Sequence, residues 1–264
     1  MNGSAMDRRA ILHLGFGGLA ALGLAGCAPE PPAASSSGAA SSSSSPVKAT
    51  IGEIPGPAQH PAAALAHSLD DPSSIWVVVN KHRPLRPSTY RPNDLVQPRV
   101  TSMVSGESAL LRAPAARALE ALAQEAAAQG TPLSLVSGFR SYQTQVATYG
   151  SYAGSVGVSG ADHASARPGY SEHQTGLAVD VGDSGGCNLQ PCFADRPLAR
   201  WVGENSHRFG FVVRYQLGFH LISGYFAEPW HLRFVGVELA TAVKKSGLHT
   251  LEEYFGLEAA PDYS

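Results

Sequence analysis

The chain has 264 residues, of which 44% are hydrophobic and 15% are charged. This hydrophobic content is ordinary for a globular protein that buries a sizeable core. The formal net charge is only −2, so no bulk electrostatic field favours nucleic acid or an anionic lipid surface, and nucleic acid is not an expected partner.

The first residues have the features of an export signal. Arg8 and Arg9 precede a glycine-interrupted apolar stretch over Ala10–Ala25, which is shorter than the ~20 residues that a membrane-spanning helix needs. The stretch ends in Leu-Ala-Gly-Cys at Cys27, a sequence that resembles the lipobox of bacterial lipoproteins. We therefore predict a signal peptide over residues 1–26 and lipid attachment at Cys27. The alternative is an uncleaved anchor with an incidental cysteine.

The segment 27–61 consists mainly of proline, alanine, serine and glycine. Such a segment cannot bury enough apolar surface to offset its chain entropy, so we predict a disordered tether behind the lipidated cysteine. Residues 62–264 then remain for a single folded domain of ordinary size. The predicted location is outside the cytoplasm, with the lipid as the only membrane attachment and a monomer as the expected oligomeric state.

Two cysteines remain in the folded region, Cys187 and Cys192, with four residues between them. In an exported protein this spacing predicts a local disulfide that closes a surface loop. Two reduced buried cysteines are the alternative. A zinc site is disfavoured here because the chain has no second cysteine pair to complete it.

The first half of the folded region contains both strand and helix patterns. Ile75–Val79 is an apolar run that predicts a short buried strand. The segment 113–129 has apolar residues at helical spacing and is followed by Gly-Thr-Pro, which predicts a helix. Leu133–Val136 predicts another strand, and a polar helix start follows over 142–149. The glycine- and serine-rich segment 150–169 predicts a loop.

Two later segments show the period of two that is typical of strands. In Leu177–Val181, three apolar residues share one face and Asp180 lies on the other. In Trp230–Phe234, the apolar face lies opposite His231 and Arg233. Strands thus dominate the second half, with helices before and between them, which predicts an α+β domain.

Two of the ten histidines lie in polar clusters. In the first cluster, which begins at Ser171, a turn at Gly176 brings His173 round beside Asp180, because an unbroken strand would place residues seven apart on opposite faces. In the second cluster, His231 follows Glu228 by three positions.

The residue types in these clusters are those of a zinc enzyme. Imidazole nitrogens and carboxylate oxygens are good zinc ligands, and three protein ligands plus a water is the open arrangement of catalytic zinc. Structural zinc is usually closed by four protein ligands. On spacing alone, packed or solvated side chains remain the alternative.

Three segments together resemble the VanY-type D-alanyl-D-alanine carboxypeptidases of zinc peptidase family M15. They are Ser137-Gly-Phe-Arg-Ser141, Ser171-Glu-His-Gln-Thr-Gly-Leu-Ala-Val-Asp180 and Glu228-Pro-Trp-His-Leu-Arg233. The match spans about residues 75–240. The resemblance implies a single α+β domain with a central antiparallel sheet and flanking helices, the fold shared with the hedgehog signalling domain.

The resemblance also assigns roles to individual residues. It implies that one zinc ion per chain is held by His173, Asp180 and His231. Glu228 matches the general acid/base of the family, which takes a proton from the attacking water. Arg140 matches an arginine that contacts substrate, either by gripping a carboxylate or by stabilising an oxyanion. The implied reaction removes the C-terminal D-alanine from peptidoglycan stem peptides.

Other residues near these motifs have two readings each. Ser137, Gln145 and Ser171 are candidates for substrate binding, with solvated positions as the alternative. Asp183 is either a partner of a ligand histidine or a turn cap. Arg233 is expected to pair with a nearby carboxylate.

Three alternatives compete with this function. A serine-type carboxypeptidase needs Ser-x-x-Lys and Lys-Thr-Gly, but the match at Ser45–Lys48 lies in the tether and Lys-Thr-Gly is absent from the sequence. A non-catalytic peptidoglycan-binding lipoprotein is disfavoured because Glu228 accompanies all three ligands. L,D-carboxypeptidases and D,D-dipeptidases of the same family share the motifs, and we expect D,D-carboxypeptidase activity over these.

Overall fold

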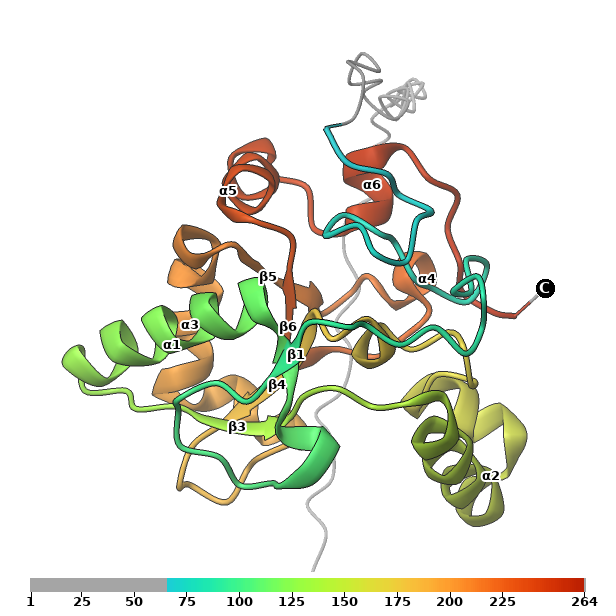
Figure 1. Cartoon of the computed structure of the whole chain (residues 1–264), viewed down its shortest axis with the longest axis horizontal. Helices are drawn as coiled ribbons and strands as arrows, with labels where there is room; N and C mark the ends of the chain where they lie inside the picture. Colours follow the sequence, from blue (N-terminus) through green and yellow to red (C-terminus); the bar gives the residue numbers. More distant parts are fainter. Residues whose placement is uncertain (1–65, 264) are drawn as a thin grey trace, which may run out of the picture. The chain divides into compact units, whose positions relative to one another are not determined.

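The computed structural model describes residues 66–263, whose arrangement is shown in Figure 1. The predicted signal peptide (1–26), the lipidation site and the tether (27–61) lie outside the described residues. The strands are β1 (Leu95–Val96), β2 (Leu111–Arg112), β3 (Ser134–Ser137), β4 (Ala178–Gly182), β5 (Phe211–Tyr215) and β6 (Glu228–Phe234). The helices are α1 (Ala113–Ala128), α2 (Tyr142–Ala164), α3 (Pro197–Asn205), α4 (His220–Ser223), α5 (Val237–Ser246) and α6 (Leu251–Phe255).

Four strands form an antiparallel sheet in the order β3-β4-β6-β5. At its centre, Asp180 of β4 lies directly across from His231 of β6. On the other side of β4, Asp180 lies across from Ser137 of β3. A slip of one residue would turn every side chain of a strand to the other face, so this register decides which side chains meet. The predicted α+β fold with a central antiparallel sheet is confirmed.

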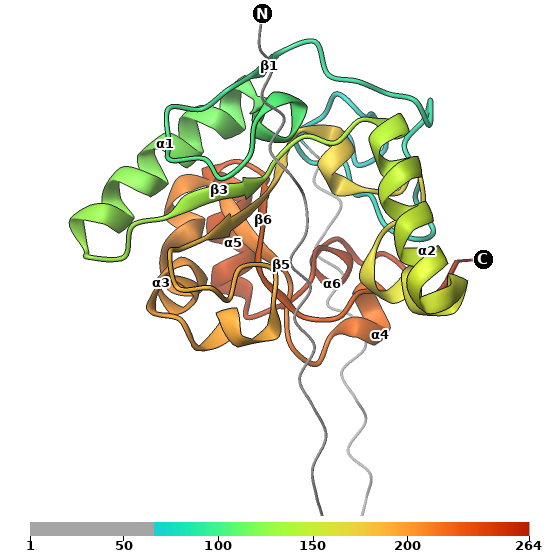
Figure 2. The ribbon, with the colours of Figure 1, turned by 90° about the horizontal axis from the view of Figure 1, so that it is seen from below.

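The main hydrophobic core includes one face of this sheet and helices α1 and α3, which lie together on one side of it (Figures 1 and 2). The central strands contribute alternate residues, as their period of two predicted, and these are Leu177, Val179, Val181, Trp230, Leu232 and Phe234. Leu119 and Leu122 of α1 and Val202 of α3 are fully buried in the same core. Helix α2 lies apart from α1 and α3 in both views. Because side chains alternate between the two faces of a strand, Asp180 and His231 project away from the face that packs in this core.

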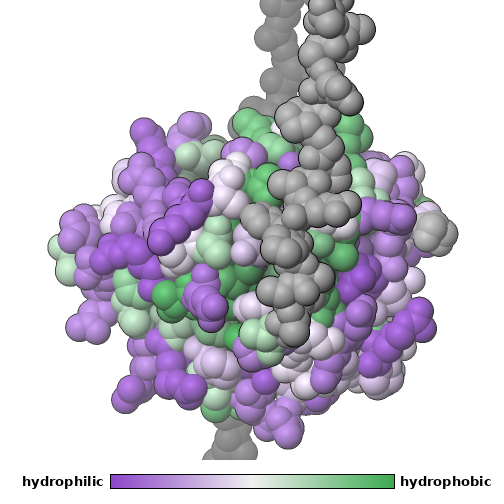
Figure 3. Space-filling model, turned by 90° about the horizontal axis from the view of Figure 1, so that it is seen from above, coloured by the Kyte–Doolittle hydropathy of each residue, from purple (hydrophilic) through white to green (hydrophobic). Residues whose placement is uncertain are grey.

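Hydrophilic residues dominate the margins of the face shown in Figure 3, and apolar residues gather nearer its middle. Within residues 66–263, every helix is too short or too polar to cross a membrane.

In the segment Ile75–Val79 the three valines are buried and the first two residues are partly buried, but the segment does not form the predicted strand, so that prediction was wrong. Two of its carbonyls bond to a side chain instead of to a neighbouring strand. Nη2 of Arg233 donates to Ile75 O at 3.2 Å and to Val77 O at 2.7 Å. The buried arginine thereby satisfies backbone groups that a strand ladder would otherwise have to pair.

The loop predicted over 150–169 was wrong for residues 150–164, because α2 continues to Ala164, and is confirmed only for residues 165–169. Gly157 alone has a non-helical backbone there, with φ 76°. The two parts of the helix on either side of it are joined by a hydrogen bond from Tyr149 Oη to Asp162 Oδ1 at 2.7 Å. Arg167 pairs with the same carboxylate at 2.9 Å. These tertiary contacts override the weak helix propensity of the glycines.

Candidate metal centre

Three buried side chains meet on the face of the sheet away from the main core. His173, Asp180 and His231 each offer one ligand atom, and these atoms lie within 4.8 Å of one another. Asp180 and His231 are brought together by strand register. His173 stands in a single 3₁₀ turn that ends at Gly176, whose φ of 67° is the left-handed conformation that glycine adopts readily. The predicted turn at Gly176 is thus confirmed.

Each histidine is oriented by a hydrogen bond on its outer nitrogen. Nδ1 of His173 bonds to the carbonyl oxygen of Gly138 at 2.7 Å, which requires a proton on Nδ1 and leaves Nε2 facing Asp180 at 3.3 Å. Nε2 of His231 lies 3.3 Å from a carboxylate oxygen of Glu172, and its Nδ1 faces Asp180 at 3.2 Å. Ligand histidines in metal sites are held in this way, by a carbonyl or a carboxylate.

The donor set fits a metal cation. Oδ1 of Asp180 is buried and makes no hydrogen bond within residues 66–263, although Nδ1 of His231 lies 3.2 Å from it. An unbonded buried carboxylate oxygen is costly unless a cation faces it. Burial alone would raise the pKa of Asp180, but positive charge on the adjacent His173 and His231 holds the pKa well below its usual value. A cation bound between the three side chains would supply that positive charge in place of protons on the ring nitrogens. Two imidazole nitrogens and one ionised carboxylate are the three-ligand set of an open zinc site.

Glu228 begins β6 beside this cluster. Its Oε2 lies 3.3 Å from Nδ1 of His231, and its side chain is 21% exposed, against 4% for His231. Glu228 therefore contacts a buried ligand and also lines the cleft in front of the ligands. A group in this position can exchange protons with a water and with a substrate.

Arg140 lines the same cleft, held by two of the residues expected to bind substrate. Nη1 of Arg140 donates to Gln145 Oε1 at 2.9 Å, and Nη2 donates to Ser137 Oγ at 3.2 Å. Gln145 is fully buried, and its amide donates to the carbonyl of Ala166 at 2.6 Å. Neither Gln145 nor Ser137 lines the cleft. The substrate contact expected of Gln145 is therefore replaced by a contact that fixes the guanidinium.

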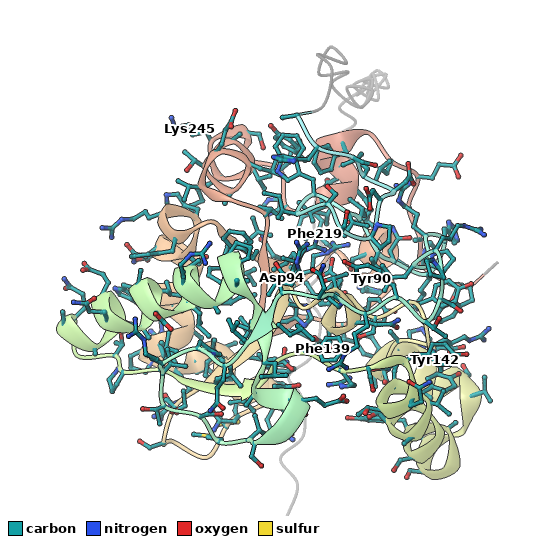
Figure 4. All side chains as sticks on the ribbon, viewed as in Figure 1. Tyr90, Asp94, Phe139, Tyr142, Phe219 and Lys245 are labelled. Atoms are coloured by element: carbon teal, nitrogen blue, oxygen red, sulfur yellow. A yellow bond between two sulfur atoms is a disulfide. The ribbon has the colours of Figure 1, made fainter. Side chains whose placement is uncertain are left out.

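The cleft has a volume of about 150 Å³ and a polar floor. Ser171, which the sequence gives as a candidate for substrate binding, lies in its wall. Phe139, directly before Arg140, lies fully buried between the sheet and α2 (Figure 4). The remaining walls are formed by Thr148, Tyr152, Ala164, Ser165, Ala166, Leu189, Tyr215, Tyr225 and Trp230.

A buried network of charges supports the metal ligands from behind. Oε1 of Glu172 pairs with Arg214 and with Arg233, each at 2.9 Å, and all three side chains are fully buried. Arg214 also makes two bonds to Glu252, at 2.7 and 2.9 Å. The expected carboxylate partner of Arg233 is thus Glu172. Burial alone would raise the pKa of Glu172, but Arg214 and Arg233 hold it well below its ordinary value.

Sequence reasoning missed this network. Glu172 lies in the segment 171–180 that matches the family and Arg214 lies between the matching segments, but no local pattern indicates that they pair. Glu252 lies beyond the motifs, on α6, 38 positions from Arg214. The sequence offered only a weak indication of this network. A charged residue needs a partner when it is buried, but the sequence does not show that these three charged residues are buried.

The loop after β4 contains the remaining predicted residues. Asp183 accepts hydrogen bonds from Gly185 N at 2.7 Å and from Arg196 Nε at 2.9 Å. Its role is therefore to organise the loop, and it makes no bond to a ligand histidine. Cys187 and Cys192 form a disulfide with a Cα–Cα distance of 5.6 Å.

Comparisons with known proteins identify the family of this chain. The model of the VanY family, described as D-alanyl-D-alanine carboxypeptidase, matches residues 108–237. A D-alanyl-D-alanine carboxypeptidase of Enterococcus faecalis is 32% identical over 216 residues, which cover 78% of this chain and 75% of that protein.

Two solved structures have the same fold. The LD-carboxypeptidase LdcB is 39% identical with a TM-score of 0.66, covering 70% of this chain and 87% of LdcB. The vancomycin-resistance D,D-pentapeptidase VanY, a mutant in complex with Zn(II), is 32% identical with a TM-score of 0.56, covering 67% of this chain and 97% of VanY. The chain therefore belongs to the VanY family of D-alanyl-D-alanine carboxypeptidases.

Proposed function

We propose that this chain is a zinc-dependent carboxypeptidase that removes the C-terminal D-alanine from peptidoglycan stem peptides. One observation carries the proposal: a cleft whose floor holds His173, Asp180 and His231 also contains Glu228 and Arg140. Metal ligands, a proton-transfer group and a cation for a carboxylate are the three parts that such a reaction requires.

The chemistry divides among these residues. Zinc held by the three ligands supplies Lewis acidity, polarising the scissile carbonyl and lowering the pKa of a water to ~7. Glu228 accepts the proton of the attacking water and donates it to the leaving amine. Glu172 and the carbonyl of Gly138 keep the two histidines in the tautomers that leave one nitrogen of each facing Asp180.

Arg140 supplies the preference for a chain end. Its guanidinium is fixed by Gln145 and Ser137, so it is oriented before substrate arrives. An oriented guanidinium binds a carboxylate through two parallel hydrogen bonds. A free terminal carboxylate of the peptide is the group that suits it.

L,D-carboxypeptidase activity is the second candidate. It is favoured by the higher identity to LdcB than to the D,D-pentapeptidase VanY, 39% against 32%. Both activities release a terminal D-alanine, and they differ in the residue that precedes it.

Defined stem peptides distinguish these functions. We expect the zinc-loaded protein to release D-alanine from a free-acid pentapeptide, and cleavage of a tetrapeptide instead identifies the L,D activity. A C-terminally amidated pentapeptide should resist cleavage because it lacks the carboxylate for Arg140. Chelation should abolish release and zinc should restore it, measured by mass spectrometry of the products. Full turnover in protein shown by elemental analysis to be metal-free would contradict the proposal.

We also propose that the domain is exported, anchored by a lipid on Cys27, and active on the cell wall as a monomer. The support comes from the sequence of the first 27 residues and from the nature of the substrate. In bacteria grown with a labelled fatty acid, the wild-type protein should carry label and Cys27→Ser should not. Equal labelling of the two proteins would exclude Cys27 as the attachment site.

A further inference from the structure

The loop over residues 183–196 forms one wall of the cleft, and none of its residues takes part in the proposed reaction. It begins three residues after the ligand Asp180. Its Leu189 lines the cleft with 42% of its surface exposed. Tyr152 of α2 lines the same cleft and is 43% exposed. The cleft thus has a polar floor and two exposed apolar side chains, which come from separate elements.

Leu189 has a backbone conformation that leucine rarely adopts. Its φ is 58°, and it is the one non-glycine residue between 66 and 263 with a positive φ. It occupies the third position of a turn closed by a hydrogen bond from Gln190 N to Cys187 O at 3.1 Å. A positive φ at that position normally calls for glycine or asparagine. Such strain persists where the surroundings impose it, and it gathers at ligand-binding sites.

Several contacts around Leu189 impose this backbone conformation. The Cys187–Cys192 disulfide closes the loop around it. The amide side chain of the preceding Asn188 accepts from Asp183 N at 2.9 Å and donates to Asp183 O at 2.8 Å. That side chain occupies the space that a β-carbon at Gly182 would fill. The loop is therefore fixed at both of its ends and cross-linked in the middle.

Arg140 and this loop both line the cleft, but they leave the β3–β4 pair at opposite ends. Strands β3 and β4 are antiparallel, so their C-terminal ends lie at opposite ends of the pair. Arg140 follows the C-terminal end of β3, whereas the loop leaves the C-terminal end of β4. If Arg140 holds the terminal carboxylate, the loop faces the part of the peptide on the N-terminal side of the scissile bond.

We propose that Leu189 is a specificity-determining residue that packs against an apolar part of the substrate peptide N-terminal to the scissile bond. The disulfide holds it in position. This inference rests on the proposed carboxypeptidase function and adds a subsite to it. A fixed apolar contact stabilises a bound peptide without the entropic loss of ordering a free loop.

The test compares a long with a short substrate. Leu189→Ala should lower kcat/KM on a free-acid pentapeptide about tenfold, mainly through KM, because a few methylene groups in an apolar subsite give discrimination of this order. The loss on N-acetyl-D-Ala-D-Ala should be at least several times smaller, since little of that peptide extends beyond the reacting centre. Leu189→Gly, which relieves the backbone strain, should behave like Leu189→Ala. Zinc content should equal that of wild type in every variant.

Two further variants complete the design. The double variant Cys187→Ser, Cys192→Ser should reproduce the loss on the pentapeptide. Leu221→Ala is the matched control, because Leu221 is 66% exposed on α4 and does not line the cleft. Equal losses on both substrates, or wild-type kinetics for Leu189→Gly, overturn the specificity role. Wild-type kinetics for the double cysteine variant overturn the role of the disulfide. Failure of the wild-type protein to cut either peptide contradicts the proposed function itself.

Discussion

Glu228→Ala is expected to keep its zinc and to lose ~10²–10⁴-fold in kcat, the usual contribution of a general acid–base group. The expectation follows from the geometry, because Glu228 lies beside the ligand set without belonging to it. The measurement combines kcat on a free-acid stem peptide with the zinc content of the same sample by elemental analysis.

His231→Ala gives the contrasting result, because it removes a ligand. This variant should lose zinc first and activity as a consequence. Loss of zinc from Glu228→Ala would make Glu228 a ligand and contradict its assignment as the proton-transfer group. If Glu228→Ala kept both its zinc and its activity, the proton would be transferred by another residue of the cleft.

Glu252→Gln is expected to lower the free energy of unfolding by about 3–5 kcal/mol, the usual cost of removing one partner of a buried ion pair. Glutamine has nearly the same shape, so the effect reports charge and hydrogen bonding instead of a cavity. The variant leaves Arg214 buried with one carboxylate partner, Glu172, and weakens the bond that Asn80 Nδ2 makes to Glu252 at 2.9 Å. Urea denaturation measures the loss, with Glu258→Gln as a control at an exposed glutamate.

The same pair predicts a pH dependence. Burial alone would raise the pKa of Glu252, but Arg214 and Asn80 hold it below the ordinary value of 4.5. A lowered pKa means that the stabilisation is complete above the unfolded-state pKa and is lost as pH falls toward the folded-state pKa. The gap in unfolding free energy between wild type and Glu252→Gln should therefore narrow as pH falls below 4.5. A gap that stays constant over that range would exclude an ionised Glu252 as its source.

The parts of the site that the sequence predicted are those carried by short-range patterns. A period of two placed Asp180 and His231 opposite the apolar faces of their strands, and a glycine turn placed His173 near them. Arg140 and Glu228 came from the resemblance to a family. None of these inferences needed knowledge of which distant residues touch.

The parts that could not be predicted depend on distant contacts. Two carbonyls of the segment Ile75–Val79 accept hydrogen bonds from a side chain 156 or more positions away. This apolar run therefore does not pair with a neighbouring strand, although its pattern predicts one. Helix α2 continues past its glycines because Tyr149 and Asp162 bond across the kink. Gln145 reads as a surface residue of a polar helix start, yet it is buried against Arg140.

The pairing of β4 with β6 determines when, during folding, the metal site forms. Two of the three ligands face each other only when strands about 50 positions apart have paired in register. Such a long-range pairing closes a large loop and therefore forms slowly. The ion then binds the folded chain and has no preformed site in the unfolded one, which makes its binding free energy part of the folding free energy. If a spectroscopically visible ion such as cobalt is added during refolding, the appearance of its bound spectrum would report when the central strands have paired.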